Sequence, residues 1–123
     1  MKASLEDIAS AFVHHEFSVA YPYFSDDVTW SLVGGVRFDG PAAVQSHCAA
    51  SSAYLESVTT TFVGFSVMRG PDYVVVESEA TYAEPTYAEP TGRSSAVASS
   101  DVFRFRDGLI SSISSYNIEL PTK

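Results

Sequence analysis

The stretch DVFRFRDGLI, residues 101–110, decides the fold because it contains the end of one strand, a tight turn and the start of the next strand. Phe103 and Phe105 share one face of the first strand with Asp101, while the residues between them point to the other face. The Asp-Gly pair that follows is typical of a two-residue hairpin turn. The stretch therefore predicts an antiparallel hairpin with a carboxyl group on its apolar face.

More strands are predicted upstream of this hairpin. The segments concerned are rich in Val, Thr and Phe or alternate apolar with polar residues, and Gly, Pro and Asp separate them. We expect long strands at residues 58–68, 73–83, 94–106 and 109–118, a shorter strand at 28–33 and an edge strand at 36–38.

Three helices are predicted in the first half of the chain. Ser4 and Asp7 have the spacing of a capping box, and a periodic apolar stripe continues that helix to about residue 14. Pro41 is typical of the first turn of a helix, which we extend to about residue 55. Between them a shorter helix is expected, with one face formed by Phe17, Ala20, Tyr21 and Phe24. Helices followed by a run of strands indicate an α+β domain with helices on one face of a curved sheet.

Composition limits the class of protein. A chain of 123 residues builds one compact core. Its net charge of −8 repels nucleic acid and anionic membranes, so neither is expected as a partner. One cysteine excludes an internal disulfide. The acidic start of the chain is unlike a signal peptide, and no apolar run reaches the roughly 20 residues of a membrane span. We expect a soluble cytoplasmic protein.

A perfect tandem repeat, TYAEPTYAEP, occupies residues 81–90. Its period of five matches no repeat architecture, and an odd period would move every side chain of a strand to the opposite face. Each copy ends in a proline, which cannot donate a hydrogen bond to a sheet. We interpret the repeat as a duplication, natural or engineered, that lengthens one hairpin.

Asp101 is the most informative single residue. Burial among aromatic side chains raises the pKa of a carboxyl group and lets it donate a hydrogen bond to a carbonyl or enolate oxygen. A structural role is equally compatible with the sequence, because a buried carboxylate also bonds backbone groups at a sheet bend or pairs with an arginine. Both interpretations stay open at this point.

Other titratable residues favour structural roles. Glu77 and Glu79 share a strand face and are expected on its solvent side. His14 and His15 are adjacent, so on a helix they diverge and cannot clamp one metal ion. Cys48 follows His47 on a helix, where neighbours do not face each other, so the cysteine is interpreted as a small core residue. No phosphate loop, nucleophile elbow or dinucleotide motif is present. We therefore expect no metal and no cofactor.

Aromatic side chains have two interpretations. They form either ordinary core or the wall of a ligand pocket, in which hydroxyl groups orient the ligand. The residues concerned are Tyr21, Trp30, Tyr54, Tyr82 and Tyr116.

Three stretches resemble one family. FSDDVTW at residues 24–30, FDGPAAV at residues 38–44 and the hairpin that begins at Asp101 and ends in Tyr116-Asn117 are similar to segments of the SnoaL-like group of the NTF2-like superfamily. The resemblance implies a single domain over residues 1–123. It also implies a cone-shaped α+β fold of the cystatin-like kind, with three helices on the concave face of a curved antiparallel or mixed sheet. An apolar pocket and a homodimer through the sheet are further implications.

The resemblance also implies roles for single residues. Asp101 stands where ketosteroid isomerases have the aspartic acid of their oxyanion hole, and Cys48 stands where they have a supporting tyrosine. Leu32 stands at the position of their catalytic base, and leucine cannot accept a proton. Asn117 stands where many polyketide-cyclase-like members have an aspartic acid. The pocket is then expected to be lined by Tyr21, Trp30, Leu32, His47, Cys48, Tyr54, Phe103, Phe105 and Tyr116.

Three functions compete on this basis. The first is an isomerase, cyclase or lyase that acts on an apolar carbonyl compound, with Asp101 as proton or hydrogen-bond donor and a tyrosine or His47 orienting the substrate. The second is a binder of a small hydrophobic molecule without catalysis. The third is a dimerising accessory domain. The leucine at position 32 favours binding, whereas Asp101 favours chemistry or polar recognition.

Overall fold

A computed structural model describes residues 3–83 and 94–121. The chain forms α1 (Leu5–Val13), the short 3-10 turns η1 (Phe17–Val19) and η2 (Tyr21–Tyr23), β1 (Phe24–Leu32), β2 (Arg37–Asp39), α2 (Pro41–Glu56), β3 (Thr59–Arg69), β4 (Tyr73–Ala83), β5 (Ser94–Arg106) and β6 (Leu109–Leu120). Most of the repeat at residues 81–90 lies outside the described residues.

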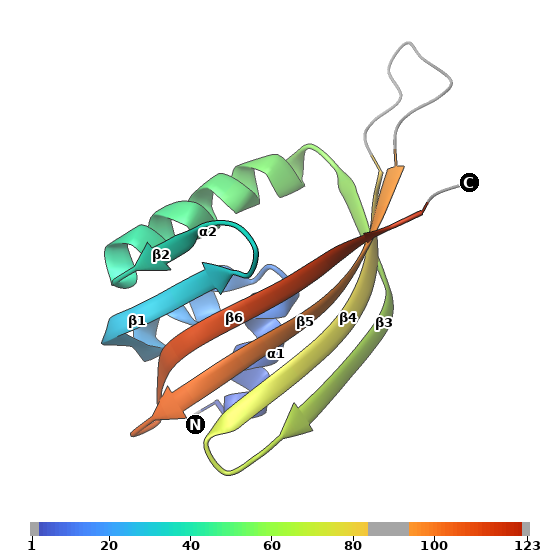
Figure 1. Cartoon of the computed structure of the whole chain (residues 1–123). Coiled ribbons are helices and arrows are strands. Elements are labelled where there is room, and N and C mark those ends of the chain that lie inside the picture. The colour runs from blue at the N-terminus through green and yellow to red at the C-terminus, as the bar shows by residue number, and fades with distance from the viewer. Residues whose placement is uncertain (1–2, 84–93, 122–123) are drawn as a thin grey trace.

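Six strands form one mixed sheet in the order β2-β1-β6-β5-β4-β3. Strands β1 and β6 run parallel, and every other neighbouring pair is antiparallel. The helical segments cover one side of the strongly curved sheet, with α1 against β3 and β4 and α2 against β1, β2 and β3 (Figure 1). The expected α+β class and mixed curved sheet are confirmed.

Helix α1 begins with the capping box that its sequence predicts and ends in a hydrogen-bonded cap. The Asp7 N–H donates to Ser4 Oγ at 3.1 Å and the Ser4 N–H donates to the Asp7 carboxylate at 3.4 Å, which completes the expected capping box. At the other end the Glu16 N–H donates to the Ala11 carbonyl and the His15 N–H to the Phe12 carbonyl. This is a Schellman motif, and His15 occupies its left-handed position with φ 70°.

The second predicted helix differs from the structure. Residues 17–23 form the two 3-10 turns η1 and η2, and Phe24 already belongs to β1. Pro22 explains the difference, because it lacks an N–H and disfavours an α conformation at the residue before it. Phe24 is buried in β1 and pairs with Ile110 of β6, so it contributes to the sheet rather than to a helix face.

The core lies between the helices and the concave face of the sheet. Phe12 is its centre: its ring packs edge-on against Phe17, Trp30 and Phe103 at centroid distances of 5.0, 5.0 and 5.5 Å. Such edge-to-face contacts add about 0.5–1.5 kcal/mol each to the burial of apolar area. Cys48 of α2 is fully buried in the same core.

The outer face of the sheet carries both polar and apolar side chains. Glu77 and Glu79 lie there in exposed positions, as predicted from their spacing. Within the described part of the chain, no helix is long and apolar enough to cross a membrane.

Candidate functional site

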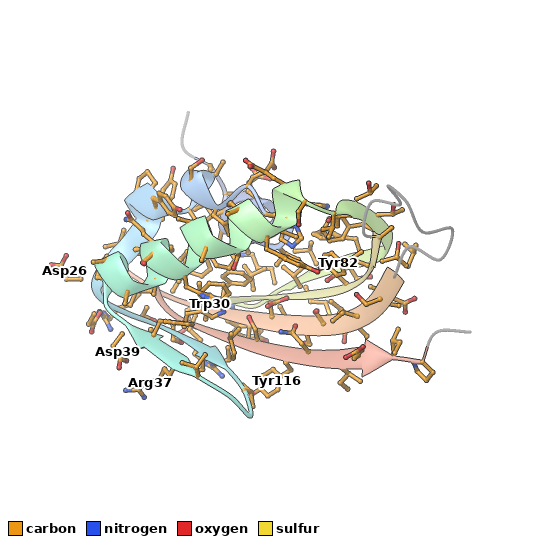
Figure 2. The ribbon with its side chains drawn as sticks, turned by 90° about the horizontal axis from the view of Figure 1, so that it is seen from above. Asp26, Trp30, Arg37, Asp39, Tyr82 and Tyr116 are labelled. Carbon is orange, nitrogen blue, oxygen red and sulfur yellow. The ribbon has the colours of Figure 1, made fainter. Side chains whose placement is uncertain are left out.

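One cavity of about 590 Å³ lies between the helical segments and the concave face of the sheet. Figure 2 shows Trp30 and Tyr82 inside this layer and Tyr116 on the opposite side of the sheet. Aromatic and aliphatic side chains form most of the wall, with a strip of polar residues from the inner face of β4, β5 and β6. The lining residues are Phe12, Val13, His15, Phe17, Trp30, Leu32, His47, Ala50, Ser51, Tyr54, Leu55, Phe62, Ser78, Tyr82, Ser95, Val97, Ser99, Asp101, Ser115 and Asn117.

Asp101 belongs to this polar strip and is 8% exposed. It lies opposite Ser115 of β6, which in turn lies opposite Leu32 of β1. The Ser115 hydroxyl donates a hydrogen bond of 2.5 Å to Asp101 Oδ1, and Trp30 Nε1 donates one of 3.0 Å to Ser115 Oγ. Three strands thus contribute one buried relay, from the indole of Trp30 through the hydroxyl of Ser115 to the carboxyl group.

In this relay Asp101 bonds to a hydroxyl group and not to an arginine. The side-chain partner of the carboxyl group is Ser115, and Arg104, which lies in the same strand, is exposed and approaches Ser114. A hydroxyl has a single hydrogen, and Ser115 directs it to Oδ1 because its oxygen already accepts from Trp30. Asp101 Oδ2 makes no hydrogen bond with the described residues, so it stays available to a ligand.

Burial raises the pKa of Asp101 from 3.8 to about 6, and the hydrogen bond from Ser115 partly opposes that rise. A carboxyl group in an apolar wall loses the hydration that stabilises its charged form, whereas a donor stabilises the charge. Asp101 therefore titrates closer to neutral pH than an exposed aspartic acid does.

Other hydrogen-bonding groups surround Asp101. Burial raises the pKa of Tyr82, and the negative charge of Asp101 adds to that rise, followed by Tyr54. Ser99 donates a hydrogen bond of 2.8 Å to the side-chain oxygen of Asn117 across β5 and β6. The cavity wall therefore holds several hydrogen-bonding groups together with the carboxyl group of Asp101.

His15 and His47 also line the cavity, from different elements. His47 of α2 stacks on Phe38 at a centroid distance of 4.3 Å and packs edge-on against Trp30 at 5.0 Å. His15 follows α1, and burial lowers its pKa, with a smaller contribution from His14. No group of three His, Cys, Asp or Glu residues that could hold a metal ion occurs in the part of the chain that the structure describes.

Five of the residues expected at the site lie in the cavity wall: Trp30, Leu32, His47, Tyr54 and Asp101. The other five do not. Cys48 and Phe103 are fully buried in the core behind the wall, and burial raises the pKa of the Cys48 thiol to about 12. Phe105 lies beyond Phe103 along β5, away from the cavity.

Tyr21 and Tyr116 are absent from the wall for different reasons. Tyr21 lies in the turn η2, where its ring packs against Phe24 at a centroid distance of 5.8 Å. Tyr116 points to the outer face because the pairing of β5 and β6 shifts between Arg104 and Phe105. Past this bulge the inward positions of β6 are Ile113, Ser115 and Asn117.

Ser115 and His15 are two of the lining residues that the sequence did not predict. Asp101 is 14 residues from Ser115 in sequence, so only the strand register brings them together. The sequence carries no signal for the direction of His15, because the left-handed position after a helix is usually occupied by glycine or asparagine.

Comparisons with known proteins identify the family and the fold. The sequence profile of the SnoaL-like domain matches residues 5–113. No curated protein sequence is a significant match. An NTF2-like protein of unknown function from Cytophaga hutchinsonii is 25% identical, with a TM-score of 0.74 over 90% of this chain and 93% of that chain.

Two more solved structures share the fold. A candidate polyketide cyclase from Xanthomonas campestris is 21% identical, with a TM-score of 0.67 over 89% of this chain and 83% of that chain. A protein from Catenulispora acidiphila with a ketosteroid isomerase-like fold, solved with trimethylamine, is 21% identical, with a TM-score of 0.62 over 92% and 86% of the two chains. The chain belongs to the SnoaL-like family of the NTF2-like superfamily.

Proposed function

We propose that the protein binds a small, neutral, apolar carbonyl compound in the cavity and that Asp101 donates a hydrogen bond or a proton to its carbonyl oxygen. One observation carries the proposal: a carboxyl group with a pKa near 6 lies in an aromatic cavity, with one oxygen held by Ser115 and the other unbonded to the described residues. A carboxyl group that holds its proton in a dry site stabilises negative charge on a developing enolate.

The wall of the cavity supports a neutral ligand. Among the described lining residues there is no lysine or arginine to pair with a phosphate or carboxylate. A volume of about 590 Å³ lies within the range of roughly 300–1,000 Å³ typical of small-molecule sites. An apolar ligand that fills this space excludes water and raises the pKa of Asp101 further, which favours the donor form.

Isomerases, cyclases and lyases that react at the carbon next to a carbonyl group share one step, the polarisation of that carbonyl group. The polyketide cyclase and ketosteroid isomerase-like folds of the structural neighbours are compatible with such chemistry. Asp101 is the residue that we assign to the oxyanion in this proposal.

A non-catalytic binder is the second candidate, and Leu32 favours it. Leu32 lines the cavity at the position where the resemblance implies a base, and its side chain cannot accept a proton. In a binder, Asp101 recognises the ligand oxygen without turnover. Proton exchange at the α-carbon of bound 1-tetralone in D2O separates the two candidates, because a binder leaves those protons in place.

The direct test is the titration of Asp101 by carbon-detected NMR, with and without 1-tetralone or androst-4-ene-3,17-dione. Both probes carry oxygens that accept hydrogen bonds and donate none. Since only the protonated carboxyl group can donate to them, binding is expected to raise the pKa of Asp101 above about 6. Asp101→Leu should weaken binding about tenfold by removing the donor, and Glu77→Gln, on the outer face, should leave it unchanged. A ketone that binds without moving the pKa of Asp101 contradicts the proposal.

A further inference from the structure

His15 lines the same cavity as Asp101 but comes from the turn after α1. Its backbone has φ 70° at a helix-capping position where glycine carries no steric penalty and histidine does. Strained conformations of this kind concentrate at functional sites, where the surrounding structure holds a side chain in place. The strained backbone of His15 therefore occurs at a residue whose imidazole ring lies in the cavity wall.

The surroundings of His15 leave its ring free for chemistry. The ring is tilted against Phe62, Phe17 and Tyr82 at centroid distances of 5.6, 5.8 and 6.2 Å. Neither ring nitrogen makes a hydrogen bond with the residues that the structure describes. Tyr82, whose ring lies near that of His15, is also close enough to Asp101 for the charge of that carboxyl group to raise the pKa of Tyr82, after the larger effect of burial.

The neighbouring His14 differs in its hydrogen bond and in its distance from the cavity. The ring of His14 stacks on Phe65 at a centroid distance of 4.0 Å, and its Nδ1 lies 3.1 Å from the carbonyl oxygen of Ser10. His14 is exposed and does not line the cavity. The structure thus contains a matched pair of adjacent histidines, of which one faces the cavity.

We propose that His15 is the proton acceptor of the cavity. It would fill the role of the base, which the side chain of Leu32 cannot fill. The inference rests on the proposed function, because it assigns the second half of the proton transfer at a bound carbonyl compound. A C–H bond next to the carbonyl breaks, and its proton binds an unprotonated ring nitrogen of His15. The electron pair moves to the carbonyl oxygen, and Asp101 donates a hydrogen bond to the enolate. The imidazolium then returns a proton to the same or a conjugated carbon, so no oxidant or co-reactant is consumed.

Burial supports this assignment. It lowers the pKa of His15, so the imidazole is neutral and able to accept a proton at pH 7, while the pKa of Asp101 is raised. Three further titratable residues line the cavity, namely His47, Tyr54 and Tyr82. His47 is the competing base, but its ring is held between Phe38 and Trp30 and its backbone lies in regular helix.

The experiment measures deuterium uptake at the α-carbon of 1-tetralone by NMR in D2O at pD near 7. The variants are His15→Asn, which tolerates a positive φ and lacks a base, and His15→Gly, which also leaves room for free imidazole. His14→Asn is the matched control, and His47→Gln tests the competing base. Ketone affinity is measured for each variant, because a proton acceptor changes the exchange rate and not the binding.

We expect both His15 variants to lose roughly a hundredfold or more of the exchange rate, the usual contribution of a positioned base. Added imidazole should raise the exchange rate of His15→Gly and leave the rates of His14→Asn and the wild type unchanged. Three results would each overturn the inference and leave the donor role of Asp101 standing. The first is an exchange rate in His15→Asn equal to that of the wild type, and the second is a loss of exchange in His47→Gln instead. The third is a ketone that binds but does not exchange its protons. Failure of 1-tetralone and the steroid ketone to bind would overturn the proposed function, and this inference with it.

Discussion

The hydroxyl of Ser115 lies 2.5 Å from Oδ1 of Asp101, and the two residues face each other on adjacent strands β6 and β5. This contact stabilises the charged form of a carboxyl group that burial otherwise keeps protonated. Ser115 therefore makes it easier for Asp101 to release its proton, against the larger effect of burial.

Replacing Ser115 by alanine is expected to raise the pKa of Asp101 above about 6. The variant removes the hydrogen bond that lowers this pKa and leaves the burial that raises it. Carbon-detected NMR of the Asp101 carboxyl group measures the change. Ser114→Ala is the control, since Ser114 is the adjacent hydroxyl and approaches Arg104 instead. An Asp101 pKa that is equal or lower in Ser115→Ala would contradict the assigned role of the hydroxyl.

The stability of the protein is expected to depend on the protonation of Asp101. The pKa of about 6 in the folded protein exceeds the ordinary value of 3.8, so proton binding favours folding. This contribution is complete below about pH 4 and is lost as the pH rises through about 6. At about 1.4 kcal/mol per pH unit, the loss amounts to about 3 kcal/mol.

Denaturant unfolding of wild type and Asp101→Asn between pH 4 and 8 tests this prediction. The free energy of unfolding of the wild type should fall relative to the variant as the pH rises, and the difference should level off above about pH 7. Glu77→Gln serves as the control for loss of an exposed acid. Parallel pH profiles for wild type and Asp101→Asn would show that the carboxyl group titrates normally.

Deletion of residues 86–90 is expected to leave the fold intact. One copy of the Thr-Tyr-Ala-Glu-Pro repeat remains, and the deleted residues fall between the end of β4 at Ala83 and the start of β5 at Ser94. The Asp101 relay depends on neither copy. Cooperative thermal unfolding of the deletion variant, with a Tm close to that of the full chain, would agree. A variant that unfolds without cooperativity would show that the second copy is structural.

The homodimer through the sheet that the family resemblance implies stays a prediction. On β6, Tyr116 and Ile118 are 48% and 66% exposed, and both alternate with the inward residues Ser115 and Asn117. If two copies meet on this face, Ile118→Glu buries a charge in the interface and shifts the protein to monomer. Sedimentation velocity at several concentrations measures the mass, with the exposed Val19→Glu, in η1, as control. Equal masses for wild type and Ile118→Glu would place any interface elsewhere.

Local sequence patterns were sufficient for the long strands of the second half of the chain and for the burial of Asp101. The bounds of β4 and β5 agree with the alternation and turn signals in the sequence, and the two-residue period places Asp101 beside Phe103 on the buried face. The 3-10 turns were not predictable in the same way. Their apolar spacing is that of a helix, and the effect of Pro22 on the backbone overrides it.

Pocket residues were harder to predict because they depend on register. Alternation from Ile110 without a shift places Tyr116 inside, and the bulge beside Arg104 and Phe105 places Ser115 inside instead. The sequence gives no signal for the position of that bulge. His15 was missed for another reason: its direction depends on one backbone angle at the helix end and not on helical periodicity.

The parallel pairing of β1 with β6 has a consequence for how the chain folds. Trp30 and Ser115 are 85 residues apart, so the relay to Asp101 closes only after the last strand has joined one of the first. Contacts of such long sequence separation slow folding, because the entropy of closing the loop is lost before the contact forms. We expect the β3–β4–β5 meander to form earlier than the β1–β6 pairing. The indole fluorescence of Trp30 should then change in the slowest refolding phase, which makes completion of the site a late event in folding.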